Sequence, residues 1–293
     1  DFSTHIEDGT RFRVNAHFQR ETVAISFRVI SNTIPVLEDL HLPPIAKELT
    51  DLPRGLVLVT GHTGSGKSTT LASMIGEINA KKSKRIITLE DPIEYALEND
   101  RSMIEQREMG ADCTAFASGL RHALRQDPDI ILVGEMRDLE TTSSTITAAE
   151  TGHLVFSTLH TVNAPQTVER IIDIYPAGQQ NQIRAMLSNT LQAVISQTLF
   201  KRVDKPGMVP CTEILLCTSA VRNCIREGRV FEIPNIIETS RRLGMQSMDH
   251  SIADMYNKGF IARDEAIIRS TNPGKMEKLL GPEPSNVYVE SLN

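Results

Sequence analysis

From residue 54 onward, short apolar runs alternate with longer stretches whose apolar residues recur at the spacing of a helix. Each run is bounded by Gly, Pro or acidic residues and lacks the polar alternation of a half-exposed strand. Such runs are typical of parallel strands covered on both faces, so the pattern predicts an α/β core, which we assign to residues 54–217. We expect strands at residues 56–60, 86–89, 130–133 and 154–157, and helices that include residues 116–124 and 183–195.

The first thirty residues show a different pattern. Phe12, Val14, Ala16 and Phe18 alternate with other residues, and a second strand-like run follows at residues 23–30. A short polar turn separates the two runs, so we expect a β-hairpin. Two strands are not stable alone, so they must pack on sequence that is missing here or on the body of the protein. Because strand-like sequence begins almost at Asp1, we expect residues 1–34 to be the remaining part of a domain whose first part is missing. Prolines in residues 35–53 predict a linker that carries a little helix.

The last third of the chain changes pattern twice more. A second hairpin is predicted at residues 197–203 and 208–216. Residues 218–270 are predicted to be helical, with Gly228, Gly244 and Gly259 at the ends of helices. Residues 271–293 are rich in Pro, Gly and Ser, and we expect a flexible tail there.

Composition narrows the class of protein. The 293 residues are 40% hydrophobic and 23% charged, which is typical of a folded globular protein. The 31 basic and 37 acidic side chains give a net charge of −6, and there are nine Phe, four Tyr and no Trp. An acidic chain with few aromatic residues is a poor candidate for direct nucleic-acid binding. No apolar run approaches the roughly 18 residues that cross a bilayer, so we expect no transmembrane segment.

The four cysteines are too few and too irregularly spaced for a disulfide scaffold, and no two form a Cys-x-x-Cys pair for zinc. The chain does not start with a basic and then apolar segment, so we find no signal peptide. We therefore expect reduced, cytosolic thiols at Cys113, Cys211, Cys217 and Cys224.

A phosphate-binding loop follows the first predicted core strand. Residues 61–69 read Gly-His-Thr-Gly-Ser-Gly-Lys-Ser-Thr, with the G-x-x-x-x-G-K-S spacing between a buried strand and a helix. The glycines allow a curl whose N–H groups point at phosphate oxygens, and the helix N-terminus adds partial positive charge. Lys67 is predicted to reach the β- and γ-phosphates and the Ser68 hydroxyl to ligate Mg²⁺. The other predicted nucleotide-binding residues are Thr63, Gly64, Ser65, Gly66 and Thr69.

Two absent motifs favour ATP as the nucleotide. A GTPase needs Asn-Lys-x-Asp, and the nearest match, Asn-Lys-Gly-Phe at residues 257–260, lacks the Asp. The Leu-Ser-Gly-Gly-Gln signature of transporter ATPases is also absent.

Acidic residues follow two of the predicted core strands. Glu135 ends the segment Asp-Ile-Ile-Leu-Val-Gly-Glu, which has the form of a Walker B motif. A carboxylate there can orient a water and accept its proton, and can hold Mg²⁺ through water. Gly134 stands where a Mg²⁺-binding Asp is usual, so metal ligation must be shared differently. Glu90 and Glu94 are candidates for holding Mg²⁺ or positioning the nucleophile; alternatively, their acidic segment only caps a helix.

Two histidines flank the strand predicted at residues 154–157. His153 precedes it and His160 follows it. An imidazole near a terminal phosphate can sense it through a hydrogen bond, so we expect His160 first and His153 second in this role; the alternative is that both are structural.

Four elements thus stand in order: the loop at 61–69, the acidic box at 89–94, the Walker B segment at 129–138 and the histidine box at 151–161. Together they closely resemble the secretion ATPases of type IV pilus and type II secretion systems, over residues 12–268. Residues 220–227, Ala-Val-Arg-Asn-Cys-Ile-Arg-Glu, look like the signature helix of the pilus-retraction motors. A four-cysteine zinc insert, common in extension and secretion motors, is missing. The chain departs from the family at His62, where Pro is usual, and at Cys224, where Leu is common.

The resemblance implies a RecA-like P-loop domain, a PAS-like N-terminal domain that is truncated here, and a helical C-terminal subdomain, closed into a homo-hexameric ring. ATP would lie between the domains, and Arg11, Arg13 and Arg28 in the predicted hairpin are candidates for reaching its phosphates. A cytoplasmic motor of this family would act at the inner membrane through a pilus platform protein, and on the pilin filament indirectly.

The leading hypothesis is therefore an ATP-hydrolysing ring motor that retracts type IV pili in twitching motility. A pilus-assembly or type II secretion ATPase of the same family remains an alternative. A non-hydrolytic, nucleotide-switched scaffold and a nucleic-acid translocase are more distant alternatives, and the acidic charge disfavours the second.

Overall fold

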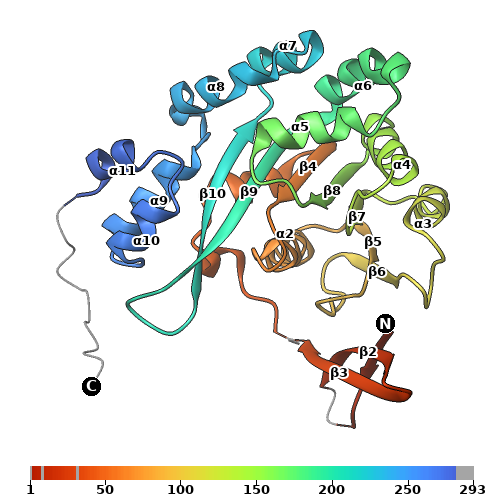
Figure 1. Cartoon of the computed structure of the whole chain (residues 1–293). Helices are drawn as coiled ribbons and strands as arrows, with labels where there is room; N and C mark the ends of the chain where they lie inside the picture. The colour runs from red at the N-terminus through yellow and green to blue at the C-terminus, as the bar shows by residue number, and fades with distance from the viewer. Residues whose placement is uncertain (1, 8–9, 31–32, 282–293) are drawn as a thin grey trace, which may run out of the picture. The chain divides into compact units, whose positions relative to one another are not determined.

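The computed structural model describes residues 2–7, 10–30 and 33–281 (Figure 1). Its strands form two sheets. The smaller has the order β1-β2-β3, and the larger has the order β10-β9-β4-β8-β7-β5-β6. The chain divides into two compact units: residues 1–37, 47–56 and 68–158 form one, and residues 38–46, 57–67 and 159–293 form the other. The boundaries of these units cross strands of the larger sheet, so they do not follow the segments expected from the sequence.

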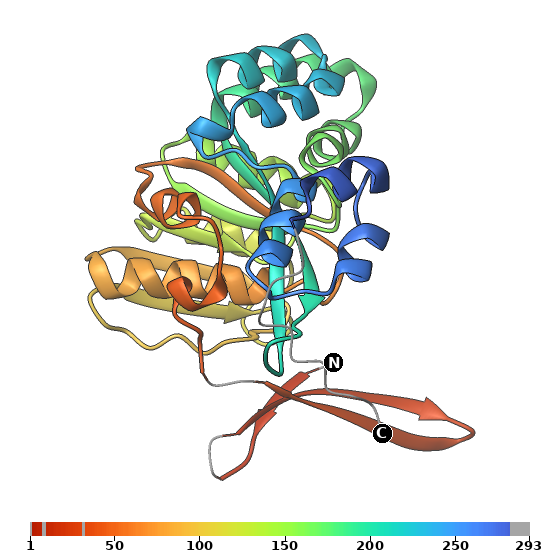
Figure 2. The same cartoon turned by 90° about the vertical axis from the view of Figure 1, so that its left-hand side faces the viewer.

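The smaller sheet contains the hairpin predicted at the N-terminal end. Strand β2 (Arg11–Gln19) pairs antiparallel with β3 (Thr22–Ile30), and β1 (Phe2–His5) adds to the other edge of β2. The hairpin is visible as a twisted red ribbon in Figure 2. Arg13 lies opposite Arg28, and Arg11 is two residues from Arg13. Because side chains alternate along a strand, the three arginines share one face, and the predicted apolar series lies on the other face.

The four predicted core strands are confirmed, each within two residues at its ends. Strands β5, β7 and β8 pair in parallel, β5 with β7 and β7 with β8, as their unbroken apolar runs indicated. Every residue of β4, β7 and β8 is buried. Their bounds are Gly55–Thr60 for β4, Arg85–Glu90 for β5, Ile130–Val133 for β7 and Leu154–Leu159 for β8.

The sequence did not predict strand β6 (Met103–Glu108), which pairs in parallel with β5 at the edge of the sheet. Its residues Met-Ile-Glu-Gln-Arg-Glu are mostly polar and half-buried. An edge strand needs neither a continuous apolar run nor a clear alternation, so sequence patterning gives little signal for it.

Helices connect these strands. The linker expected at residues 35–53 contains η1 (Leu37–Leu40), α1 (Ile45–Glu48) and η2 (Leu49–Asp51), in agreement with the prediction of a little helix. The helices of the core are α2 (Lys67–Lys81), α3 (Phe116–Ala123), α4 (Leu139–Glu150), α5 (Ala164–Asp173) and α6 (Ala177–Thr190).

The helix predicted through residue 195 was wrong beyond residue 190. Leu191 begins strand β9 (Leu191–Lys201), which pairs antiparallel with β10 (Met208–Leu216). Leu191, Val194 and Ile195 are all fully buried. A strand buried on both faces shows no alternation, and its apolar residues can fall by chance at helical spacing.

The C-terminal region is helical as predicted. Gly228, Gly244 and Gly259 follow helices at φ values of +74°, +94° and +76°, a conformation that glycine adopts without strain. The helices are α7 (Ser219–Glu227), η3 (Val230–Glu232), α8 (Ile233–Thr239), η4 (Arg241–Leu243), α9 (Met248–Asn257) and α10 (Arg263–Ile268).

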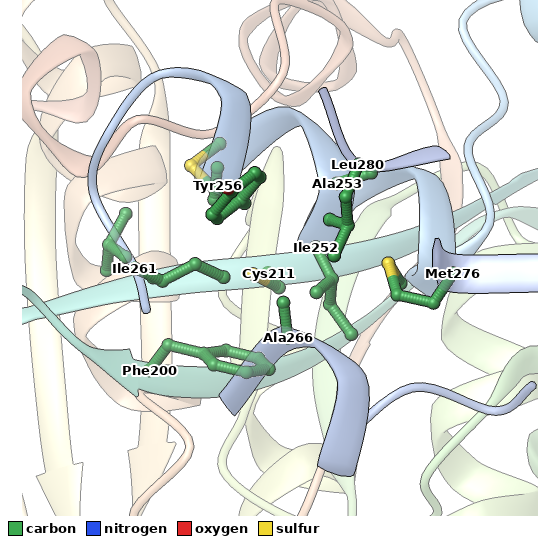
Figure 3. Close-up of a cluster of buried hydrophobic side chains, with 11 residues drawn as sticks. Phe200, Cys211, Ile252, Ala253, Tyr256, Ile261, Ala266, Met276 and Leu280 are labelled. Carbon is green, nitrogen blue, oxygen red and sulfur yellow. The ribbon is translucent and has the colours of Figure 1, made fainter. Parts of the chain in front are cut away.

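The flexible tail expected from residue 271 was wrong for its first part. Helix α11 (Pro273–Leu279) begins with the side chain of Asn272 accepting a hydrogen bond from the N–H of Lys275. Met276 is fully buried in an apolar cluster with Phe200 of β9, Ile252 of α9 and Ala266 of α10 (Figure 3). One buried methionine thus fixes a segment whose composition resembles a tail. Residues 282–293 lie outside the described part of the chain.

Candidate active site

The phosphate-binding loop has the predicted form. It connects the buried strand β4 to helix α2, which begins at Lys67. Gly61, Gly64 and Gly66 have φ values of +142°, +80° and +88°, which residues other than glycine rarely adopt. The sequence therefore has glycine at the three loop positions where the backbone has a positive φ angle.

Lys67 turns back across this loop. Its Nζ donates to the carbonyl oxygens of Gly61 at 2.8 Å and His62 at 3.0 Å, and the residue is 9% exposed. The ammonium group is thus held at the loop, where a phosphate would bind.

The loop also fits a phosphate by its unused polar groups. The first N–H groups of a helix have no partner within the helix, and α2 has no acidic residue in its first turn to neutralise its positive end. The buried hydroxyl of Ser65 has no hydrogen-bond partner among the described residues. Ser68 is half-buried in this first turn. These groups suit a phosphate, and the Ser68 hydroxyl suits a hard cation such as Mg²⁺.

Thr69 connects this helix to the acidic box. Its hydroxyl lies 2.9 Å from the hydroxyl of Tyr95, which directly follows Glu94. The contact brings the start of α2 and the segment after β5 together. No sequence pattern points to Tyr95, because the two residues are 26 positions apart.

The two acidic-box residues have different surroundings. Glu90 ends β5 and accepts hydrogen bonds from the Thr88 hydroxyl at 2.7 Å and the Gln106 amide at 2.9 Å. Glu94 is exposed. Burial raises the pKa of Glu90 above its usual value, although these hydrogen bonds oppose the shift. Glu90 is therefore a half-buried carboxyl group oriented by two hydrogen bonds, and not an acidic cap in solvent.

This pKa shift predicts how the acid stability of the protein changes in Glu90→Gln. A carboxyl group whose pKa is higher in the folded state than in the unfolded state disfavours folding once it ionises. We expect Glu90→Gln to have a larger free energy of unfolding than wild type at pH 7. The difference should shrink as the pH falls from the raised pKa of the folded state toward the ordinary carboxyl pKa of 4.5, and it should be absent below that value. Urea unfolding at several pH values checks this, and a difference that grows toward low pH would contradict it.

Glu135 follows β7 at the same edge of the sheet as Glu90, because β5 and β7 are parallel neighbours. Its carboxylate forms an ion pair with Arg137 Nε at 2.7 Å, and its side chain is 16% exposed. Two bonds fix the surrounding backbone to β8: Thr158 Oγ1 donates to Gly134 O at 2.6 Å, and Met136 N–H donates to Thr158 O at 3.1 Å. A carboxylate held in this way can serve as a general base.

The structure explains why glycine stands before Glu135. A Cβ at Gly134 would lie 3.0 Å from the Leu89 carbonyl oxygen and 3.4 Å from the Glu90 Cα. The close packing of β5 against this turn leaves little room for the aspartate that is usual in a Walker B motif.

The two histidines lie at opposite ends of β8. His160 follows the strand and is exposed, and the N–H of Gly61 donates to the carbonyl of the preceding residue, Leu159, at 3.3 Å. His153 precedes the strand, and its Nδ1 lies 3.0 Å from Ala148 O. A six-residue strand spans roughly 20 Å, so the structure brings His160, but not His153, to the start of the phosphate-binding loop.

The three arginines share one face of the small sheet but differ in exposure. Arg28 is exposed, and Arg11 and Arg13 are half-buried. Arg11 makes a long ion pair, 3.9 Å, with Glu108. Glu108 in turn accepts from the N–H of Ile93 in the acidic box at 3.2 Å.

Cysteines and metal clusters play no visible part in the site. All four cysteines are free, and burial raises the pKa of Cys211 and Cys217 to about 12, so both are neutral thiols. Within the described ranges, no group of His, Cys, Asp and Glu is arranged to hold a metal ion.

Among the helices of the described residues, none is long and apolar enough to cross a membrane.

Comparison with known proteins agrees with this site. Residues 33–258 match the family model described as "Type II/IV secretion system protein". The chain is 49% identical over 276 residues to the "Twitching motility protein" of Neisseria gonorrhoeae, covering 94% of this chain and 74% of the relative. It is 48% identical over 266 residues to the "Type IV pilus retractation ATPase PilT" of Pseudomonas aeruginosa, covering 91% and 77%.

A solved structure is similar along nearly the whole chain. The "Crystal Structure of the Pilus Retraction Motor PilT and Bound ADP" superposes with a TM-score of 0.88 at 45% identity, covering 95% of this chain and 79% of that one. The fold, the complete phosphate-binding loop, the carboxylate after β7 and these similarities lead to one conclusion: the chain belongs to the Type II/IV secretion system protein family and is an ATPase of the PilT type.

Proposed function

We propose that the protein powers the retraction of type IV pili, and hence twitching motility, by ATP hydrolysis in a homo-hexameric ring. The observation that carries this proposal is the similarity to PilT proteins over more than nine-tenths of the chain. Because it covers 94% of the chain for one relative and 95% for the solved structure, it extends beyond the ATPase motifs into the N-terminal sheet and the C-terminal helices. We assign the protein to the cytoplasmic face of the inner membrane, acting through a platform protein.

The residues of the site receive the following roles in this proposal. The loop at residues 63–69 holds the phosphates, and Lys67 neutralises their charge. Mg²⁺, held by Ser68 and through water by Glu135, would polarise the terminal phosphoryl group. Glu135 orients the attacking water and accepts its proton.

The remaining residues assist this reaction. Glu90 and Glu94 complete the acidic edge beside Glu135. His160 senses the terminal phosphate, and we leave His153 without a direct contact to it. Arg11, Arg13 and Arg28 lie on one strand face and are candidates for supplying positive charge to the phosphates in the assembled ring.

The proposal is tested by complementation. The full-length protein is expressed in a cell that lacks its own retraction motor, and pilus retraction is scored by twitching. We expect retraction to be restored. A purified protein that hydrolyses ATP but leaves retraction absent, or that restores pilus assembly instead, would favour the assembly or secretion alternative.

The signature helix α7 separates two kinds of contribution. Arg222 is turned inward: its guanidinium donates to Ser188 O at 2.6 Å, Asn189 O at 3.1 Å and Gln192 Oε1 at 2.9 Å. It therefore holds α7 to the junction between α6 and β9. Glu227, at the end of α7, is exposed.

The exposure of Glu227 predicts which property its substitution affects. We expect Glu227→Gln to reduce twitching strongly while ATP hydrolysis stays within about twofold of wild type, because an exposed side chain contributes little to folding. Glu169→Gln on the exposed face of α5 is the matched control and should retain both. Loss of ATP hydrolysis in Glu227→Gln would show that this helix serves catalysis rather than force transmission.

A further inference from the structure

Strand β9 contacts the phosphate-binding loop through Gln197. The Nε2 of this buried glutamine donates to the carbonyl oxygen of Ser65 at 2.7 Å. A Cβ at Gly61 would lie 2.2 Å from Gln197 O, and one at Gly66 would lie 2.7 Å from Gln197 Nε2. Gln197 therefore packs so closely against the loop that two of its three glycines, Gly61 and Gly66, have no room for a side chain.

The hydrogen bond fixes the plane of one loop peptide. The C=O and N–H groups of a trans peptide point in opposite directions. Because Gln197 holds the Ser65 carbonyl toward β9, the N–H of Gly66 points away from β9. Backbone N–H groups of this part of the loop are those that bind phosphate. The orientation is set before the nucleotide arrives, which reduces the ordering that binding requires.

A second contact holds the same stretch of β9 to the C-terminal helices. Arg269, at the end of α10, donates to Leu199 O at 2.8 Å and to Thr198 Oγ1 at 2.5 Å. Its guanidinium also lies 3.9 Å from the centre of the Phe200 ring. Phe200 is fully buried beside Ala266, in the apolar cluster where α9, α10 and α11 pack against the β9–β10 hairpin (Figure 3).

These contacts form a short sequence of neighbours: α10, residues 198–200 of β9, Gln197 and the loop. Thr198 adds a minor link, because its hydroxyl lies 3.4 Å from His62 Nε2 in the loop. Thr60, the last residue of β4, donates to Ser196 Oγ at 2.9 Å and fixes the strand on the other side of Gln197.

We propose that Gln197 is a positioning residue for the phosphate-binding loop, and that Arg269 couples it to the C-terminal helices. The helices α9–α11 thereby influence nucleotide affinity without touching the nucleotide. The inference rests on the ATPase activity of the chain and does not require that the motor retracts pili.

The first test measures ADP binding with Mg²⁺ by titration calorimetry on the full chain. Gln197→Met keeps the volume of the side chain but removes the donor. Gln197→Glu keeps its shape and replaces the donor by an acceptor. We expect ADP affinity to fall about tenfold or more in both variants, because a buried hydrogen bond to the loop is lost. The melting temperature without nucleotide should also fall, because the Ser65 carbonyl loses its partner and Gln197→Glu buries a carboxylate. The ADP affinity of the folded variants is therefore the measurement that decides.

The second test removes the link to α10. Arg269→Lys keeps the charge but loses the planar fork that reaches both Leu199 and Thr198. We expect ADP affinity to fall several-fold. The matched control is Arg263→Lys on the same helix. Its guanidinium lies 5.8 Å from the centre of the Tyr256 ring and donates to Gly281 O at 3.5 Å, away from residues 198–200 of β9. This control should bind ADP as wild type does.

The double variant Gln197→Met with Arg269→Lys separates coupling from independent effects. If Arg269 acts through Gln197, the double variant binds ADP no more weakly than Gln197→Met alone. Additive losses would overturn the coupling. Unchanged ADP affinity in Gln197→Met and Gln197→Glu, or a fall in melting temperature alone, would overturn the positioning role. Neither result would affect the complementation test of pilus retraction.

Discussion

Replacing Glu135 by glutamine should leave ATP binding near wild type and reduce ATP turnover by about 10² to 10⁴-fold, the usual contribution of a general base. The amide keeps the size of the carboxylate but cannot accept the proton of the attacking water. The backbone around it should stay in place, because Thr158 holds both Gly134 and Met136. Loss of the ion pair with Arg137 should matter little, since Arg137 is 63% exposed.

Steady-state turnover and nucleotide titration together check this expectation. Glu150→Gln, an equal change of charge at the exposed end of α4, is the control and should keep wild-type turnover. Undiminished hydrolysis in Glu135→Gln would remove Glu135 from the chemistry and favour Glu90, the half-buried carboxyl group at the neighbouring strand end, as the general base. Loss of ATP binding instead would indicate that Glu135 mainly shapes the site.

The second large effect is expected at Gly61. Its Cβ would lie 2.2 Å from the backbone oxygen of Gln197, and its φ of +142° is unfavourable for any other residue. The obstructing atom belongs to a strand that is paired along its length with β10, so it cannot move aside as a flexible side chain would. We expect Gly61→Ala to lower the free energy of unfolding by about 3 kcal/mol or more, from overpacking and backbone strain together.

Gly64→Ala provides a matched comparison within the same loop. Its φ is +80°, but a Cβ there would have no atom within 4 Å. Only the backbone strain remains, so the expected loss is about 1 kcal/mol. Urea unfolding of both variants without nucleotide measures the difference. Equal losses at the two positions would show that strain, and not the close approach of β9, accounts for the glycine at position 61.

Much of the fold followed from local patterns. The unbroken apolar runs predicted β4, β5, β7 and β8, because strands buried on both faces need apolar residues at every position. Alternation predicted the β2–β3 hairpin, and the three glycines marked the ends of helices. These features depend on residues close together in the chain.

The incorrect predictions share a different cause. Leu191, Val194 and Ile195 have the spacing of a helix and form a strand, since pairing with β10 decides their conformation. Met276 converts an apparent tail into a helix because a cluster from other elements receives its side chain. The polar strand β6 is held by β5 and not by its own hydrophobicity.

The active site divides in the same way. The sequence by itself determined the phosphate-binding loop, Glu135, the acidic box and the resemblance to secretion ATPases, because the chemistry of each requires specific residues at a short, fixed spacing. Only the tertiary structure brought His160 to the start of the phosphate-binding loop, gave the reason for Gly134, and brought in Tyr95, Gln106 and Gln197. Gln197 lies 132 residues from the carbonyl that it holds. No local pattern encodes such a contact, because it exists only once β9 has taken its place in the sheet.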